Sequence, residues 1–348
     1  MVENRDTAWV PASFVLQWHL TDRCDRQCTH CYQDEGGHGK ELDWMQLMEV
    51  LGQFRALLGH WRRARCSVPA QITVTGGEPY LREDFPRLLE YMARERGIYS
   101  FAVLSNGGQI DRATAFHLAR VHPVFVQVSV DGQPERHDQM RGGGDFARVE
   151  RAIRLLKTAG VKTLVSFTAH PGNAGDFPWV ARWAWRLGVD RVWSDRLLPL
   201  GAAAQWEKGQ FSPLATKDFF VAMRRARDVW WGRVWPRGEV SMQRALQFLV
   251  GDGRPYHCTA GDRLLALLPD GTVLPCRRLP LAVGQVWDPG GLRRIYDEQA
   301  LLRQLRHPEA MPDGCQECFY VRLCRGGLRC LSYAVTGDPF RRDPGCWL

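Results

Sequence analysis

Short apolar runs alternate with amphipathic stretches through the first part of this chain. Six of these runs have the length and the β-branched or aromatic content of β-strands. The stretches between them place apolar residues at helical spacing, and this alternation is typical of a parallel β/α fold. The predicted strands are residues 14–20, 71–75, 100–104, 124–130, 162–168 and 191–194.

The fourth run, residues 124–130, is almost continuously apolar, which predicts a strand that is covered on both faces. Right-handed crossovers would curl six such strand–helix units into a partial (βα)6 barrel of the TIM type. Reactive groups in barrels of this kind lie at the C-terminal ends of the strands. We therefore expect the residues that follow the six runs to form the site.

The residue composition and the hydrophobic pattern of the sequence change after the sixth run. Residues 216–235 and 241–250 are predicted to form two helices, and their tryptophans are best explained by packing. From Tyr256 onward Gly, Pro and Cys dominate and long periodic runs are few. We predict a barrel at 1–215, a helical bridge at 216–254 and a small cysteine-rich domain at 255–348 that bound metal would stabilise.

Composition narrows the class of protein. The chain has 348 residues, 45% of them hydrophobic, and a net charge of +8 that is spread along its length. The local basic cluster at 61–65 has no accompanying basic and aromatic repeat, so no nucleic-acid partner is predicted. No signal peptide and no run of about 18 apolar residues is present. We therefore expect a cytoplasmic protein without a membrane partner.

Eleven cysteines then require an explanation. Cytosolic thiols are kept reduced, and a chain of this length can bury its own core without a disulfide scaffold. Metal or redox chemistry is therefore the leading interpretation. Ten cysteines fall into two groups, and Cys66, which belongs to neither, is interpreted as a buried free thiol.

The first group follows the first predicted strand, in the spacing Cys24-x3-Cys28-x2-Cys31. A loop this tight can bring three sulfurs to one inorganic cluster. Because a four-iron cluster takes four ligands, three cysteines would leave one iron open to an exogenous ligand. A zinc site with His30 as the fourth ligand, or buried thiols without a metal, are the alternatives.

This loop resembles the signature of the radical S-adenosylmethionine (SAM) superfamily. The resemblance implies a [4Fe–4S] cluster on Cys24, Cys28 and Cys31, with SAM bound at the open iron. It also implies that one electron cleaves SAM to methionine and a 5'-deoxyadenosyl radical, which removes a hydrogen atom from the substrate. The position before the third cysteine is commonly aromatic in the family. Here it is His30, followed by Tyr32, and an imidazole can still stack near adenine.

Further candidates for the SAM pocket follow the next strands. Gly76 and Gly77 allow close backbone approach, and Glu78 offers a carboxylate to a cationic amine. A glycine pair alone is usually a turn, but in this position the segment resembles the GGEP motif of the family. Short polar groups that suit ribose hydroxyls, although each could be an ordinary turn, end the third and fourth strands. The predicted cofactor-binding residues here are Gly76, Gly77, Glu78, Pro79, Ser105, Asn106, Ser129 and Asp131.

Two arginines complete the predicted pocket. Arg141 can bind the SAM carboxylate through its guanidinium fork, or it is a plain surface arginine. Arg196 ends the sixth strand, and we expect it to face the cavity and to contact a carboxylate of SAM or of the substrate.

The second group of cysteines lies in the tail. Zinc is not excluded by counting, since two zinc sites could use up to eight ligands. The order and gaps nevertheless resemble the SPASM domain, which carries one or two auxiliary iron–sulfur clusters. By this resemblance a nearer cluster takes Cys258, Cys276 and Cys330, and a farther cluster takes Cys315, Cys318, Cys324 and Cys346.

The nearer set departs from the family pattern. The family places a cysteine four residues after Cys324, where this chain has Leu328, and Cys330 would substitute for it. Three thiolates leave three possibilities open, namely a non-cysteine ligand such as His257 or Asp262, an open iron, or a smaller cluster.

The resemblance implies an enzyme that modifies a peptide or protein side chain, for example by crosslinking or oxidation. The alternatives are a small-molecule or porphyrin substrate, a non-catalytic iron–sulfur electron carrier and a zinc-structured interaction module. Only 23 residues precede Cys24, so we expect a separate carrier protein to present a leader peptide, and a donor such as flavodoxin or ferredoxin to supply electrons. Sulfatase-maturing relatives have an Asp after the nearer-cluster cysteine. Here Arg277 and Arg278 follow Cys276, which suggests an anion-binding rim or two solvated side chains.

Overall fold

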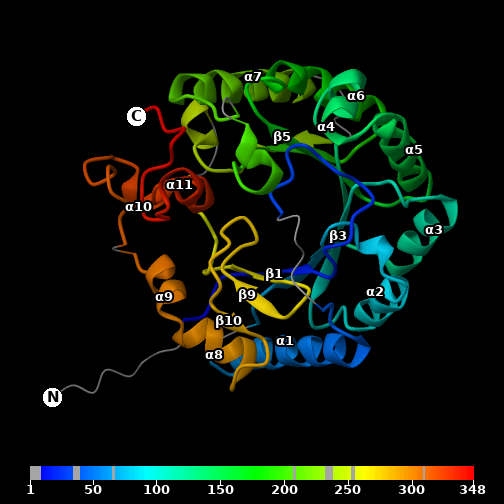
Figure 1. Cartoon of the computed structure of the whole chain (residues 1–348), viewed down its shortest axis with the longest axis vertical. Coiled ribbons are helices and arrows are strands. Elements are labelled where there is room, and N and C mark those ends of the chain that lie inside the picture. Colours follow the sequence, from blue (N-terminus) through cyan, green and yellow to red (C-terminus); the bar gives the residue numbers. More distant parts are fainter. Residues whose placement is uncertain are drawn as a thin grey trace.

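The computed structural model describes residues 9–33, 40–64, 67–206, 209–231, 238–251, 255–308 and 310–348. Within these ranges one sheet forms the centre of the molecule, in the strand order β10-β9-β8-β1-β2-β3-β4-β5-β6-β7. Neighbouring strands from β1 to β7 pair in parallel, and β8 pairs in parallel with β1. The sheet is curled, and helices surround it (Figure 1).

All six predicted strands are present, and the predicted partial (βα)6 barrel is confirmed. In β4 the side chains of Val126, Gln127 and Val128 are all buried, as expected for a strand covered on both faces. Val124 lies outside the strand and is 42% exposed. The strands are β1 (Phe14–His19), β2 (Ala70–Thr75), β3 (Ser100–Ser105), β4 (Val126–Ser129), β5 (Thr163–Ala169) and β6 (Arg191–Arg196).

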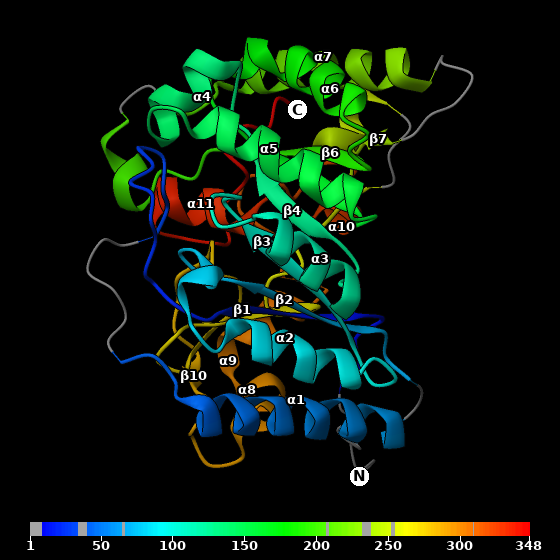
Figure 2. The ribbon, with the colours of Figure 1, turned by 90° about the vertical axis from the view of Figure 1, so that its right-hand side faces the viewer.

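Amphipathic helices cover the outer face of the barrel and follow one another along its side (Figure 2). In α2 the buried residues Phe85, Leu88, Leu89 and Met92 recur at helical spacing, so a single stripe faces the strands. The helices of this part are α1 (Trp44–Ala64), α2 (Phe85–Arg94), α3 (Arg112–Val121), α4 (Pro134–Arg141), α5 (Asp145–Thr158), α6 (Phe177–Arg186) and α7 (Pro213–Trp231), with the short 3₁₀ turns η1 (Pro79–Leu81), η2 (Ala174–Asp176) and η3 (Gly201–Gln205).

The cysteine-rich tail continues the sheet of the barrel. Strand β8 (Leu264–Leu267) pairs with β1, and β9 (Thr272–Leu274) and β10 (Gly284–Gln285) follow as antiparallel strands. The helices of the tail occupy the side of the ring between α1 and α7 (Figure 1). They are α8 (Gly291–Glu298), α9 (Ala300–Arg306), α10 (Val321–Cys324) and α11 (Arg329–Thr336). The predicted domain boundaries, with the barrel ending at residue 215 and the cysteine-rich domain beginning at residue 255, stay predictions.

Aromatic packing fastens the tail to the outside of the barrel. The rings of Phe14, Trp61 and Tyr296 form a triangle of edge contacts, with centroids 4.9, 5.1 and 5.5 Å apart. These rings come from β1, α1 and α8, and all three are almost fully buried. Such pairs contribute about 0.5–1.5 kcal/mol each beyond the burial of their area. The tail therefore shares its core with the barrel.

One predicted helix is wrong. Within residues 241–250 only the 3₁₀ turn η4 (Gln247–Val250) forms, because Leu246 has a left-handed backbone (φ 64°) that a helix cannot accommodate. The short strand β7 (Glu239–Val240) precedes it and joins the edge of β6. The prediction at 216–235 corresponds to α7, although residues 232–237 lie outside the described part, as does Cys66. No helix in the described part is long and apolar enough to cross a membrane.

Candidate active site

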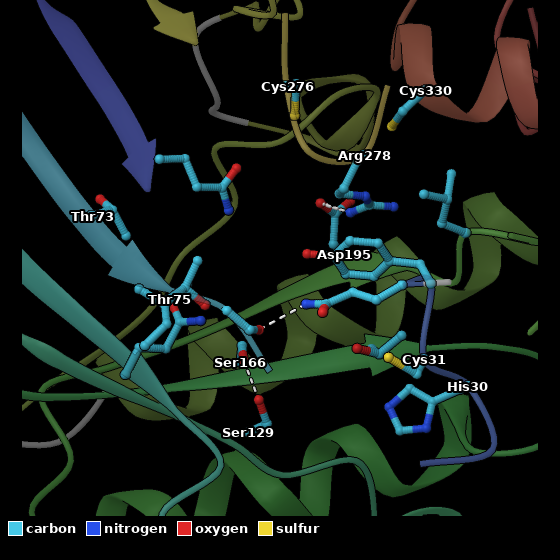
Figure 3. A pocket seen from close by; sticks show the side chains of 18 of the residues that line it. His30, Cys31, Thr73, Thr75, Ser129, Ser166, Asp195, Cys276, Arg278 and Cys330 are labelled. Carbon is cyan, nitrogen blue, oxygen red and sulfur yellow. Dashed lines mark hydrogen bonds and ion pairs between the residues drawn. The ribbon is translucent and has the colours of Figure 1, made fainter. Parts of the chain in front are cut away.

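A cavity of about 1740 Å³ opens at the C-terminal ends of the barrel strands. Its wall includes Cys24, Cys28 and Cys31 from the loop after β1. Cys258, Cys276 and Cys330 from the tail line it as well. Figure 3 shows Cys31 and His30 on one side, and Cys276 and Cys330 on the other. The first group of cysteines and the nearer set of tail cysteines therefore share one chamber.

The glycine pair after β2 packs against the backbone of the first cysteine loop. Gly77 N donates to Thr21 O at 2.7 Å, and Glu78 N donates to Arg23 O at 2.8 Å. A Cβ atom on Gly76 would lie 2.4 Å from Thr21 O, and one on Gly77 would lie 2.3 Å from Arg23 O. The close backbone approach predicted for the glycine pair is therefore found, and the backbone that it approaches is that of the first cysteine loop. Only glycine at these two positions lets the end of β2 lie so close to this loop.

The three thiols of the loop form an electrostatically coupled group. The pKa of Cys28 is raised to about 11, mainly by burial and also by neighbouring Cys31 and Cys24, while Arg141 opposes the shift. Asn106 Nδ2 lies 3.9 Å from the sulfur of Cys24, and Arg141 Nη1 lies 3.8 Å from that of Cys28. A bound cluster would ionise such thiols, and donors beside sulfur tune iron–sulfur centres. These residues fit an iron–sulfur cluster with three cysteine ligands.

The ring of His30 lies between two charged side chains. Its Nε2 lies 3.1 Å from a carboxylate oxygen of Asp131 and 3.3 Å from Arg141 Nη2. His30 Nε2 is therefore engaged by Asp131 and Arg141.

Asp131 is completely buried and holds its neighbours in place. Its carboxylate accepts from Arg141 Nε at 2.5 Å and from Thr168 N at 2.7 Å. Burial disfavours its charge, but Arg141 and His30 outweigh burial and lower its pKa well below the usual range. Arg141 lines the cavity, whereas Asp131 does not. Asp131 therefore acts on the cavity by orienting Arg141 and His30, and its direct contact with SAM stays a prediction.

Glu78 has a different environment from the one expected. It is completely buried, and its carboxylate accepts from Ser105 Oγ at 2.9 Å, Asn106 N at 2.8 Å and Tyr80 N at 3.2 Å. Burial raises its pKa to about 7. Glu78 thus ties the end of β2 to the end of β3 and does not line the cavity. Buried Pro79 begins η1 beside it.

Other predicted residues do reach the cavity. Ser129 contacts Ser166 across β4 and β5, with their hydroxyl oxygens 3.3 Å apart. The lining residues from the predicted cofactor set are His30, Tyr32, Gly76, Gly77, Ser105, Asn106, Ser129, Arg141 and Arg196.

Arg196 is one of the residues that line this cavity, and its guanidinium is engaged by the tail. Both Nη atoms donate to Asp343, at 2.8 and 2.6 Å, and the two side chains are 4% and 0% exposed. Successive residues of a strand point to opposite sides, so Trp193 and Asp195 face inward while Arg196 faces the tail. Arg196 therefore lines the cavity as expected, but its guanidinium is bound by Asp343, and its contact with a carboxylate of SAM or of the substrate stays a prediction.

The tail cysteines fall into two coupled sets. The pKa of Cys276 is raised to about 11 and that of Cys330 to about 12, mainly by burial and also by Cys258. Burial also raises the pKa of Cys315, with contributions from Cys346 and Cys318. The pKa of Cys324 is raised to about 12, mainly by burial and also by Cys346. These couplings reproduce the two sets of the SPASM resemblance, although the cluster ligands themselves stay predictions.

The additional ligands considered for the nearer set are engaged with each other. His257 Nε2 lies 3.5 Å from Asp262, whose carboxylate also accepts from Trp9 Nε1 at 3.0 Å. The two arginines after Cys276 differ. Arg277 is 2% exposed and lies over the ring of Tyr32, whereas Arg278 lines the cavity.

Three functional side chains were not singled out from the sequence. Gln33 Nε2 donates to Gly76 O at 2.7 Å and so fastens the far end of the cysteine loop to the glycine pair. Asp195 could have been found by following the strand alternation from Trp193. Arg244, in the segment after β7, carries no local signal, because only the tertiary structure brings it to the cavity wall.

Comparison with known proteins agrees with this geometry. Residues 18–184 match the family described as the radical SAM superfamily. Mycofactocin maturase MftC of Mycobacterium ulcerans (strain Agy99) is 30% identical over 358 residues, covering 96% of this chain and 88% of that protein. PqqA peptide cyclase of Ruegeria pomeroyi is 29% identical over 352 residues, covering 97% and 88%.

Solved structures share the fold. The structure of anSMEcpe with bound AdoMet aligns with a TM-score of 0.73 at 20% identity, covering 96% of this chain and 90% of that one. Streptococcus suis SuiB bound to S-adenosylmethionine aligns with a TM-score of 0.70 at 15% identity, covering 97% and 77%. The chain belongs to the radical SAM superfamily and is an enzyme of that class.

Proposed function

We propose that this radical SAM enzyme modifies a side chain of a peptide or protein that binds in the cavity between the two groups of cysteines. The size of the chamber carries the proposal. At about 1740 Å³ it exceeds the range of roughly 300–1,000 Å³ that is usual for small-molecule sites. SAM and the clusters would occupy its two ends, and the space between them would take a segment of a second molecule. The names of the relatives, a maturase and a peptide cyclase, support the same substrate class.

The residues of the chain have separate tasks in this proposal. Cys24, Cys28 and Cys31 would hold the cluster, and with SAM it supplies the one-electron chemistry that removes a hydrogen atom. Gly76 and Gly77 keep the cysteine loop against β2 and leave room beside it. Arg141, charged because Asp131 outweighs the effect of its burial, holds a fixed positive charge next to Cys28. That charge favours the thiolate form of Cys28.

The tail has a supporting task. We propose that its two coupled sets of cysteines hold one or two auxiliary iron–sulfur clusters, the nearer one on the cavity wall at Cys258, Cys276 and Cys330. A reductant such as flavodoxin or ferredoxin would supply electrons, and a separate carrier protein would present the peptide. The coupling of the thiols and their location on the wall support the assignment.

The proposal is tested by anaerobic reconstitution. Iron and sulfide are counted, dithionite and SAM are added, and 5'-deoxyadenosine is measured with and without candidate peptides. The candidates are peptides encoded by short reading frames beside the coding sequence. We expect 5'-deoxyadenosine to form and one peptide to change mass only when SAM is present. Formation of 5'-deoxyadenosine with every peptide unchanged, and with a small molecule consumed instead, would contradict the peptide assignment.

A further inference from the structure

Three charged side chains from distant parts of the sequence meet on the cavity wall. Asp195 points inward from β6, Arg244 follows β7, and Arg278 lies two residues after Cys276 in the tail. We call these residues the cavity triad. Figure 3 shows Asp195 and Arg278 between Cys31 on one side and Cys276 on the other. A substrate that spans the chamber must therefore pass the triad.

The triad is held rigidly. Arg278 forms an ion pair with Asp195 and donates from Nη2 to Arg196 O at 2.8 Å. Arg244 Nη2 lies 3.4 Å from the same carboxylate, and its Nη1 donates to Tyr256 OH at 3.3 Å. The guanidinium of Arg244 also lies 4.6 Å from the centre of the Trp193 ring. Stacking of this kind fixes the plane of the guanidinium.

The triad carries more donors and more positive charge than its own members use. Two guanidinium groups supply five N–H donors each, and a single carboxylate lies between them. Arginine side chains are not deprotonated in proteins, so Arg244 and Arg278 both carry a positive charge. Nε of Arg278 is buried and has no hydrogen-bond partner among the described residues. Arg244 remains 35% exposed on the cavity side.

Neutralisation of the tail thiols explains only part of this arrangement. Both arginines oppose the raised pKa of Cys276, and Arg278 also opposes that of Cys330. If the two arginines served only to neutralise these thiols, Arg244 would need neither its stacking contact with the Trp193 ring nor an exposed guanidinium. A planar anion that accepts two hydrogen bonds is the ligand that such a fork fits best.

We propose that the cavity triad binds a carboxylate of the substrate, either the C-terminal carboxylate of a peptide or an Asp or Glu side chain. The inference rests on the proposed function, because it names the substrate group that the chamber recognises. Asp195 holds the two guanidinium groups at a fixed separation, and Arg244 and Arg278 supply the free donors. The bound carboxylate anchors its neighbouring residue between the two groups of cysteines.

The experiment uses the reconstituted full-length enzyme with SAM bound and three labelled hexapeptides of Ala and Ser. One has a free C-terminus, one is its C-terminal amide, and one is the amide with a single internal Glu. Fluorescence anisotropy gives the Kd of each peptide. We expect at least one of the two carboxylate peptides to bind about tenfold or more tightly than the neutral amide. The stronger of the two identifies the source of the carboxylate.

Variants assign the effect to the triad. Arg244→Gln should abolish the preference for the carboxylate peptide, and Arg244→Lys should restore part of it. Arg154→Gln is the control for net charge, since Arg154 is 62% exposed on α5 and pairs only with Glu150 among the described residues.

Equal or absent binding of acid and amide peptides by the wild type would overturn the inference, and so would an unchanged preference in Arg244→Gln. Formation of 5'-deoxyadenosine is measured on the same samples. Its loss in the wild type would contradict the proposed function, whereas its presence together with equal binding would contradict the cavity triad alone.

Discussion

The buried ion pair between Arg196 and Asp343 offers a sharp test of how the tail is held to the barrel. The two side chains are 4% and 0% exposed, and two charge-assisted hydrogen bonds of 2.8 and 2.6 Å join them. Asp343 also accepts from Leu328 N and Gly345 N, both at 2.9 Å. One carboxylate therefore joins the end of β6 to the segments that carry Cys330 and Cys346.

Asp343→Asn removes the charge but keeps the shape of the side chain. Breaking one partner of a buried ion pair costs about 3–5 kcal/mol, because the remaining charge is left in a poorly solvated site. The amide NH₂ would also face one of the two backbone donors, which costs about 1–3 kcal/mol. We expect the free energy of unfolding to fall by about 4 kcal/mol or more. Arg196→Met in the same background removes the stranded cation, so the double variant should recover about 1–3 kcal/mol relative to additivity.

The assay is urea unfolding of the wild type, both single variants and the double variant, combined with the equilibrium binding of SAM. If Arg196 instead serves the SAM carboxylate, Arg196→Met would weaken SAM binding while Asp343→Asn would leave stability nearly unchanged. A loss below about 1 kcal/mol for Asp343→Asn, or strictly additive effects in the double variant, would refute the reasoning.

Three further predictions concern the first cysteine loop and its support. Cys28→Ala should remove about four irons per chain and abolish the formation of 5'-deoxyadenosine. The control Cys66→Ala should keep the wild-type iron content and activity. Retention of activity in Cys28→Ala would contradict the cluster assignment. Gly77→Ala should displace the loop, since its Cβ would lie 2.3 Å from Arg23 O, and it should therefore lower the iron content and the affinity for SAM. Gly97→Ala is the matched control, because a Cβ atom there meets nothing within 4 Å. Equal behaviour of the two variants would count against close packing of the loop on Gly77. Burial raises the pKa of Glu78 from 4.5 to about 7 in the folded protein. As the pH rises, the Glu78 carboxyl group therefore ionises in the unfolded chain before it ionises in the folded protein. The free energy of unfolding should fall by about 3 kcal/mol between about pH 4.5 and pH 7. In Glu78→Gln this decline should disappear, and parallel pH profiles of the two proteins in urea unfolding would refute the shift.

Local patterns in the sequence determined much of this protein. The six short runs rich in β-branched and apolar residues specify the parallel strands, and the fourth is almost continuously apolar because that strand is covered on both faces. The spacing of Cys24, Cys28 and Cys31 determines that three thiols share one loop, since so few residues cannot carry them apart. The glycine pair after β2 marks a close backbone approach for an equally local reason: a Cβ atom there has no room.

Contacts between distant residues were decided only by the tertiary structure. Pairing of β8 with β1 makes the tail part of the sheet, and no periodicity near residue 264 records that partner. The orientation of Arg196 toward Asp343 depends on a residue 147 positions away, and the cavity triad assembles from three separate elements. Electrostatic partners of this kind are chosen by proximity after folding. A sequence pattern therefore shows which residues can carry charge, whereas the fold decides which charges meet.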